Sequence, residues 1–182
     1  MAGIFPRFNL KGTRMKLYPF AAIFVLMAAT RMHFSGHLPD ASLAAFLLAG
    51  FFLDSPIAFA ALLLEAGLLD YLAISKFGVS DYCISPAYWF LIPAYGVLWQ
   101  AGRSLAAKGS VARFSIIPLL ALSAAFLISN GAFFLFSGRF EIAGIAEYFA
   151  RVVRYYPPYV LGAYLYLIPV TLLFFRARMR HG

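Results

Sequence analysis

The chain has 182 residues, of which 63% are hydrophobic and only 12% are charged, and its formal net charge is +8. Too few polar side chains are present to cover a soluble globule, so the composition excludes a water-soluble domain and indicates an integral membrane protein. The basic residues lie in short segments between apolar runs, where lysine and arginine record membrane orientation. The positive charge therefore implies no nucleic-acid partner.

Six apolar runs predict one all-α transmembrane domain over residues 1–182, a bundle of six membrane-spanning helices. The predicted spans are 17–34, 41–53, 57–75, 86–101, 114–136 and 157–175. The second run is short, because at about 1.5 Å per residue it covers only some two-thirds of a hydrocarbon core of roughly 30 Å. It must thin the membrane, borrow flanking residues or fail to cross. Pro56 separates it from the third run, since proline disfavours helix in the preceding residue and can start the next helix.

Residues 142–156 predict a further helix between the last two spans, because apolar and charged positions fall on opposite faces at helical spacing. We expect this amphipathic segment to lie at the outer membrane surface. A lid that faces lipid and has no role in ligand binding is an equal alternative. The apolar positions are Ile142, Ile145, Phe149 and Val152, and the charged ones are Glu147, Arg151 and Arg154.

The distribution of basic residues predicts the orientation. One side carries three basic segments, which lie before the first span, after the fourth span and at the end of the chain. These residues are Arg7, Lys11, Arg14, Lys16, Arg103, Lys108, Arg113, Arg176, Arg178 and Arg180. The other side carries Lys76, Arg139, Arg151 and Arg154. Because positive loops stay inside, both termini of this multi-pass membrane protein are predicted to be cytoplasmic.

Polar side chains in several spans fall at similar depth, near the predicted outer membrane surface. They are Arg31, Asp70, Tyr88, Asn130, Tyr159 and Tyr164. We expect these side chains to converge on one face of the bundle. A charge within a membrane helix costs about 2.5–3.5 kcal/mol, so each charged group needs a partner or a water-filled cavity.

Glu65 lies five positions before Asp70, which rotates the helix by roughly 140° between the two side chains. The two acids therefore cannot both face one partner squarely. We predict that Asp70 faces a ligand cavity and that Glu65 faces the bundle. A buried pair of Arg31 with one acid, which only fixes helix packing, is the alternative.

The single cysteine, Cys83, lies in the polar break "SDYCISPAYWF" on the predicted outer side, where Ser85 and Pro86 predict the N-cap and first residue of the next helix. A lone thiol makes no internal disulfide, and its spacing from His33 and His37 requires neither a Cys-His nucleophilic pair nor a zinc site. One thiolate does suit a transition metal whose other positions are filled by a macrocycle. His37 is the rival ligand, since imidazole also suits transition metals.

The loop "DYCISPAYW" and the pattern of six apolar runs resemble the BtuM family of cobalamin transporters. That family shares the fold of the substrate-binding S-components of energy-coupling-factor transporters. The resemblance implies an S-component-like bundle in the bacterial inner membrane that binds cobalamin in a cavity open to the outside. It also implies that Cys83 is the axial cobalt ligand, a residue linked in the family to removal of the cyanide ligand. Asp70 and Tyr88, on either side of this loop, would line the pocket with Arg31, Asn130 and Tyr159.

Two questions about partners and class stay open. S-components that dock on an energy-coupling module typically present an alanine-x-x-x-alanine face on their first helix, which the run 17–34 lacks. Ala41, Ala45 and Ala49 have this spacing in the second run, where it predicts either a docking face or close internal packing. A small membrane enzyme or assembly factor with an outward-facing thiol is the alternative to a vitamin carrier.

Overall fold

The computed structural model describes residues 13–31, 38–108, 110–140 and 144–180, and within them the chain is helical. The prediction of an all-α protein is confirmed for this part of the chain. Six α-helices and two short 3-10 helices, η1 and η2, make up the structure. Their bounds are α1 Thr13–Arg31, α2 Ser42–Phe52, α3 Pro56–Phe77, η1 Asp81–Cys83, η2 Pro86–Phe90, α4 Leu91–Lys108, α5 Val111–Phe136 and α6 Ile145–Arg180.

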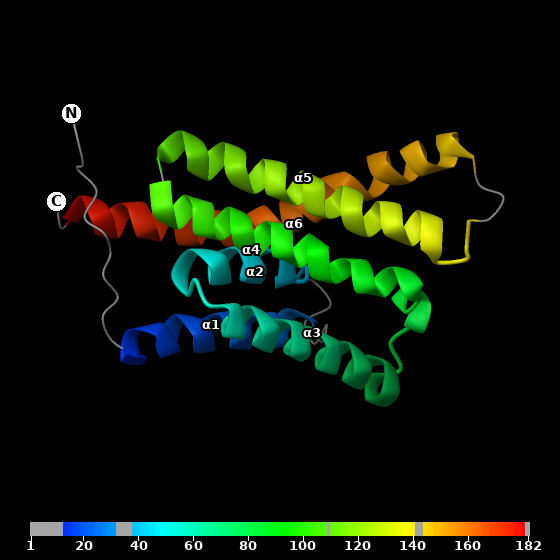
Figure 1. Cartoon of the computed structure of the whole chain (residues 1–182), viewed down its shortest axis with the longest axis horizontal. Helices are drawn as coiled ribbons and strands as arrows, with labels where there is room; N and C mark the ends of the chain where they lie inside the picture. Colours follow the sequence, from blue (N-terminus) through cyan, green and yellow to red (C-terminus); the bar gives the residue numbers. More distant parts are fainter. Residues whose placement is uncertain (1–12, 32–37, 109, 141–143, 181–182) are drawn as a thin grey trace.

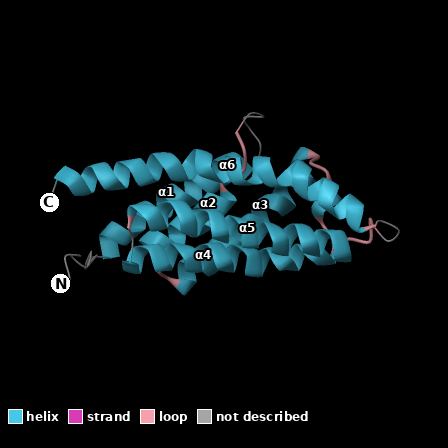
Figure 2. Ribbon diagram, turned by 90° about the horizontal axis from the view of Figure 1, so that it is seen from above, coloured by secondary structure: helices cyan, strands magenta, loops and turns pink. Residues whose placement is uncertain are grey.

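Each α-helix runs antiparallel to the α-helix before it, so the bundle has two ends (Figure 1). We call the end where α1 begins and α6 finishes the terminal end. The opposite end carries η1 between α3 and α4, and we call it the cysteine end. Figure 2 shows the helices stacked in layers, with α6 along one side of the bundle and α4 along the other. The antiparallel arrangement places the predicted basic segments of α4, α5 and α6 together at the terminal end.

Local sequence sets the limits of α3. The Ser55 hydroxyl accepts a hydrogen bond from the Ala58 backbone N–H at 3.4 Å, and Pro56 occupies the first turn. Gly78 ends the helix with φ of 66°, a left-handed conformation that glycine adopts without strain. The predicted break before the third span is therefore confirmed.

Among the described residues, three helices are long and apolar enough to cross a membrane, over Pro56–Phe77, Ala112–Phe136 and Ile145–Ala177. Their outward faces carry large apolar side chains, such as Ile57, Leu64 and Leu161, which are 82%, 76% and 69% exposed. Exposed apolar surface on this scale is expected for helices in contact with lipid. Residues 145–156, predicted as a separate surface helix, form the first part of α6 and continue through Pro157 and Pro158 into the last apolar run.

The predicted span 41–53 corresponds to α2, the shortest α-helix of the bundle. This helix lies in the core. With 11 residues it is about 16 Å long, roughly half a hydrocarbon core. Its buried residues are Ser42, Ala44, Ala45, Phe46, Leu47, Leu48, Ala49 and Gly50. Three outcomes were foreseen for this run. The length and burial of α2 fit the third, in which the helix does not cross the membrane by itself.

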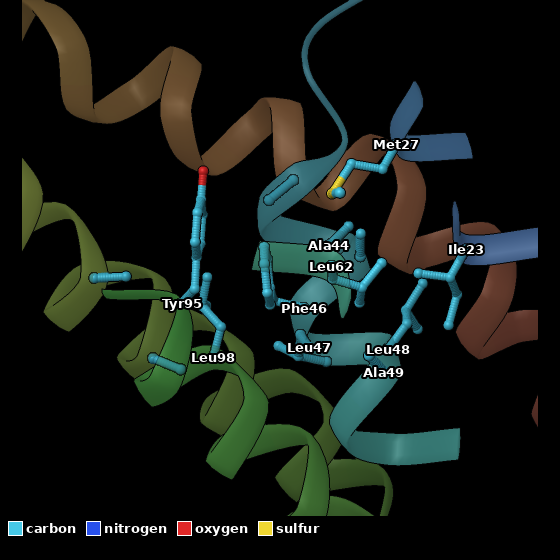
Figure 3. Packing of buried hydrophobic residues seen from close by; sticks show 14 of the residues in the cluster. Ile23, Met27, Ala44, Phe46, Leu47, Leu48, Ala49, Leu62, Tyr95 and Leu98 are labelled. Carbon is cyan, nitrogen blue, oxygen red and sulfur yellow. The ribbon is translucent and has the colours of Figure 1, made fainter. Parts of the chain in front are cut away.

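The backbones of α2 and α4 approach closely because glycine lies at both contact points. A Cβ atom built on Gly50 would lie 2.0 Å from the Trp99 carbonyl oxygen, and one built on Gly102 would lie 2.0 Å from the Leu47 carbonyl oxygen. Small residues permit such approaches between membrane helices. Figure 3 shows the ring of Phe46 beside that of Tyr95 on α4, and the two rings are stacked with their centroids 4.1 Å apart.

The alanine face of α2 is internal. Ala41, Ala45 and Ala49 are all completely buried among the other helices. Of the two interpretations of this spacing, close internal packing is therefore the one that the structure shows. A docking surface for another protein cannot use these three residues without opening the bundle.

Candidate functional site

Arg31, the last residue of α1, organises a polar cluster where α2 begins. Its side chain is 8% exposed. The guanidinium forms a bidentate pair with Asp70 on α3, in which Nε donates to Oδ1 and Nη2 donates to Oδ2, both at 2.7 Å. Two parallel charge-assisted hydrogen bonds of this kind fix both distance and orientation. The buried pair foreseen as the alternative role of Arg31 is therefore present.

The same guanidinium also contacts the start of α2 and the second turn of α4. Nη1 of Arg31 donates to the Ser42 hydroxyl at 2.7 Å, to Asp40 Oδ2 at 3.1 Å and to the Tyr95 hydroxyl at 3.2 Å. One side chain therefore connects α1, α2, α3 and α4 near the cysteine end. Its charge cannot be removed without disturbing all four helices.

Asp40 supports the first turn of α2. Its Oδ1 accepts hydrogen bonds from the Ser42 backbone N–H at 2.9 Å and from the Ser42 hydroxyl at 2.6 Å. Sequence analysis missed Asp40, Ser42 and Tyr95 as members of this cluster. A signal was available for the first of them, because an aspartate immediately before an apolar helical run is a common helix-starting residue.

Asp70 is held from two sides. Besides the pair with Arg31, its Oδ2 accepts a hydrogen bond from the Tyr88 hydroxyl at 2.6 Å, and the Asp70 side chain is 24% exposed. Tyr88 belongs to η2, so this bond fastens the segment after Cys83 to α3. The structure thus brings Arg31, Asp70 and Tyr88 together, as their similar depth predicted.

The charge of the cluster is negative overall. Asp40 and Asp70 are two carboxylates that share the single guanidinium of Arg31. Glu65, one and a half turns before Asp70, is 5% exposed, and within the described chain neither of its side-chain oxygens has a hydrogen-bond partner. The cluster therefore suits a ligand that offers positive charge or N–H donors.

The loop with the single cysteine is anchored by its neighbours. The Ser80 hydroxyl accepts a hydrogen bond from the Tyr82 backbone N–H at 3.2 Å, which starts η1. The guanidinium carbon of Arg139 lies over the ring of Tyr82, 4.1 Å from the ring centroid. The ring centroids of Tyr82 and Phe133 are 5.6 Å apart. Cation–π contacts of this kind hold the short helix against the end of α5. For Cys83 itself the description covers the backbone only.

The start of the fourth helix differs in one respect from its prediction. Pro86 begins a helix, as predicted, but the first five residues form the 3-10 helix η2 before α4 begins at Leu91. Ser85 occupies the N-cap position, yet it makes no capping hydrogen bond, and among the described residues its buried hydroxyl has no partner. The predicted N-cap position is therefore confirmed, and the helix that it starts begins with a 3-10 turn.

Two further predicted site residues, Tyr159 and Asn130, lie on α6 and α5. Tyr159 packs edge-on against Phe126, with the ring centroids 5.2 Å apart, at the contact of α5 and α6. The side-chain oxygen of Asn130 is buried, and within the described residues it has no hydrogen-bond partner. His33 and His37 lie outside the described residues.

A cavity of about 340 Å³ opens at the other end of α2, near the terminal end of the bundle. Of the polar residues expected to converge at the cysteine end, Tyr164 instead lines this cavity, and the others do not. In comparisons with known proteins, no family model matches the chain, and no curated protein matches its sequence significantly. The fold by itself defines an all-helical protein with helices that can cross a membrane.

Proposed function

We propose that this protein binds cobalamin at the cysteine end of the bundle and carries it across the bacterial inner membrane. The observation that carries the proposal is the hydrogen bond between Tyr88 and Asp70. This bond joins the segment that follows the single cysteine to the charged cluster around Arg31. The residue that carries the thiol and a cluster of polar side chains therefore lie at one end of the protein. A large metal complex with many amide groups needs both a metal ligand and hydrogen-bond partners of this kind.

In the proposed complex, Cys83 coordinates the cobalt as an axial ligand. A soft thiolate suits a transition metal, and the metal itself favours loss of the thiol proton. When the incoming vitamin is cyanocobalamin, sulfur displaces either the upper cyanide ligand or the vitamin's own nucleotide base. Where it displaces cyanide, the proton and cyanide leave together as hydrogen cyanide. The oxidation state of cobalt is unchanged, so this ligand exchange requires no reductant.

The polar cluster supplies the recognition of the macrocycle in this proposal. The exposed edge of Asp70 accepts hydrogen bonds from the vitamin's amide N–H groups, and Tyr88 and Arg31 hold that carboxylate in place. Asn130 and Tyr159 contribute from α5 and α6, where the buried amide oxygen of Asn130 offers an unused acceptor. Cobalamin binding is therefore expected to weaken when the Asp70 carboxylate is replaced.

For the topology, we propose that the six-helix bundle sits in the membrane with both termini in the cytoplasm and η1 outside. The excess of basic residues at the terminal end supports this orientation. In this arrangement α2 is surrounded by protein and need not reach either surface. Docking on an energy-coupling module would require a surface other than the alanines of α2, which are buried.

The test of sulfur coordination is the visible spectrum of purified protein after incubation with cyanocobalamin. Wild type and His37→Ala should show the same shifted spectrum, and Cys83→Ser should leave the vitamin's spectrum unchanged. Ser85→Ala, in the same loop, is the matched control and should behave as wild type. A shifted spectrum with Cys83→Ser would show that sulfur is not the ligand.

The orientation has its own test, because the chain has a single cysteine. A thiol reagent that cannot cross membranes should label Cys83 in intact cells or spheroplasts that lack bound vitamin. Prior incubation with cobalamin should protect the thiol. Labelling that occurs only after the membrane is broken would overturn the orientation and, with it, capture from the outside.

A further inference from the structure

The cavity near the terminal end is apolar and is built from four helices. Leu47, Leu48 and Phe51 of α2 and Leu105 of α4 form its inner wall. The start of α5 and the last third of α6 form the rest. The other lining residues are Phe114, Ser115, Pro118, Tyr164, Leu167, Ile168, Val170, Thr171, Leu172, Phe174 and Phe175. At about 340 Å³ it lies within the roughly 300–1,000 Å³ range of small-molecule sites.

α5 and α6 cross one another beside α2 (Figure 1). Two hydrogen bonds join them: the hydroxyls of Ser123 and Tyr156 are 2.7 Å apart, and the Tyr164 hydroxyl donates to the Ser115 carbonyl oxygen at 3.2 Å. Phe51, in the last turn of α2, lies in the wall of the cavity, so α2 ends alongside this space. The gap is bounded by aromatic rings, and the centroid of Phe114 lies 5.1 Å from that of Phe175.

The cavity adjoins the lipid-facing surface. Ile168 and Leu172 are cavity-lining residues of α6, yet they are 53% and 56% exposed. An apolar site with such a rim receives its occupant from the hydrocarbon phase. The polar side chains in the lining are Ser115, Tyr164 and Thr171, and the Tyr164 hydroxyl already donates to the Ser115 carbonyl oxygen. A lining with so few polar groups favours an apolar occupant over water.

Positive charge flanks the aromatic wall. Arg113 directly precedes Phe114, and Arg176 directly follows Phe175, and both arginines are exposed. Basic groups next to an apolar space between membrane helices are the typical features of a site for an anionic lipid headgroup.

From these contacts we propose a binding site for a phospholipid with an anionic headgroup. One acyl chain occupies the cavity between α2, α5 and α6, and the headgroup phosphate lies at Arg113 and Arg176. This lipid site lies away from the cysteine end, so lipid binding can be tested independently of cobalamin binding. Its occupancy would fill the space that the short α2 leaves and would stabilise the bundle.

The experiment is native mass spectrometry of the delipidated protein in detergent, with equimolar phosphatidylglycerol and phosphatidylcholine of identical acyl chains. Wild type should retain phosphatidylglycerol in preference. The variant Arg113→Gln with Arg176→Gln should bind it about thirtyfold more weakly, from about 1 kcal/mol for each basic residue. Arg139→Gln with Arg154→Gln, which removes equal charge at the cysteine end, is the matched control and should bind as wild type.

Two further variants test the cavity itself. Thr171→Phe fills it from α6, and Ile168→Trp covers its exposed rim without changing the buried core. Each variant should no longer retain phosphatidylglycerol, and each should still give the Cys83-dependent spectral shift with cyanocobalamin. Glycerophosphoglycerol, which has no acyl chains, should not bind. Equal retention of the two lipids by wild type, or retention at the wild-type level by Ile168→Trp, would overturn the proposal.

Discussion

The two ends of α2 meet opposite environments. At its first residue, Ser42, the helix meets Arg31, Asp40 and Asp70, whose hydrogen bonds are short and numerous. At its last turn, Phe51 faces an apolar cavity. Both arrangements follow from a helix of 11 residues, which is too short to fill the bundle from one end to the other.

The contrast shows how a membrane protein can use a helix that does not cross. Polar groups are tolerated at one end because they satisfy one another, whereas isolated charges would be costly at that depth. Apolar space is tolerated at the other end because lipid is available to fill it. Substitutions against the middle of α2 are expected to have the largest effect. Those at its polar end follow, and the acid outside the hydrogen-bonded cluster has the smallest.

The largest effect is expected for Gly102→Ala. Its new Cβ would lie 2.0 Å from the backbone oxygen of Leu47, which no side-chain rotation can relieve. Separation of α2 from α4 would disturb both ends together, so we expect a loss of about 3 kcal/mol or a failure to accumulate in the membrane. Thermal unfolding in detergent measures this loss.

Gly67→Ala is the control, because a Cβ at Gly67 meets nothing within 4 Å. There alanine should be neutral or stabilising by up to about 1 kcal/mol, since glycine is the poorer helix former. Equal stability of the two variants would contradict the close contact of α2 and α4.

The second prediction concerns the polar end alone. Asp70→Asn removes the charge that faces Arg31, while Asp40 remains as its other acidic partner. Removal of one partner of a fully buried pair costs about 3–5 kcal/mol. Because the Asp70 side chain is 24% exposed, we expect a smaller loss, of about 2 kcal/mol, in a protein that still folds.

Capture of cobalamin by Asp70→Asn should fall as well, while the cysteine-dependent spectrum of the fraction that binds is kept. Ligand capture and unfolding are measured on the same preparation. Loss of expression would show that Asp70 is needed for folding rather than for the ligand. Wild-type stability together with wild-type capture would contradict both roles.

What the sequence predicted well is local in the chain. The limits of α3 follow from Ser55, Pro56 and Gly78, which act within a turn of their own positions. The grouping of Arg31, Asp70 and Tyr88 followed from depth, because charged groups in a membrane must find one another.

What it missed depends on how helices distant in the sequence meet. Tyr95 joins the cluster only because α4 crosses α2 at Gly50 and Gly102, and no spacing in the chain predicts that crossing. The internal role of α2 was also hidden, since a buried core helix and a short membrane span have the same apolar composition. The alanine spacing indicated close packing without showing which helix was the partner.

The third prediction separates the contributions to the polar end. Tyr88→Phe removes one hydrogen bond to Asp70 and leaves the pair with Arg31 in place. Loss of a hydrogen bond to a charged group costs about 1.5 kcal/mol. A cycle with Asp70→Asn should give a non-additive result, because both variants remove the same contact. Additive losses would mean that Tyr88 stabilises the protein by other contacts.

The smallest effect is expected for Glu65→Gln. Both carboxyl oxygens of Glu65 are buried, and no described residue donates a hydrogen bond to either of them. Its neighbours on the same face of α3, Leu62 and Leu69, are buried and apolar. A buried acid without a hydrogen-bond donor contributes no stabilising bond, so glutamine, which has nearly the same shape, should change the free energy of unfolding by less than about 0.5 kcal/mol.

Glu65→Leu should then be neutral or stabilising, since apolar side chains often replace buried charges without loss. Leu69→Gln, one turn further along the same face, is the control for sensitivity. It should lose about 2 kcal/mol, because it buries a polar group in place of an apolar one. Destabilisation of Glu65→Gln by more than about 1 kcal/mol would mean that the carboxylate has a partner in the membrane. Arg31 would be the first candidate, and the two acids would then compete for the same guanidinium.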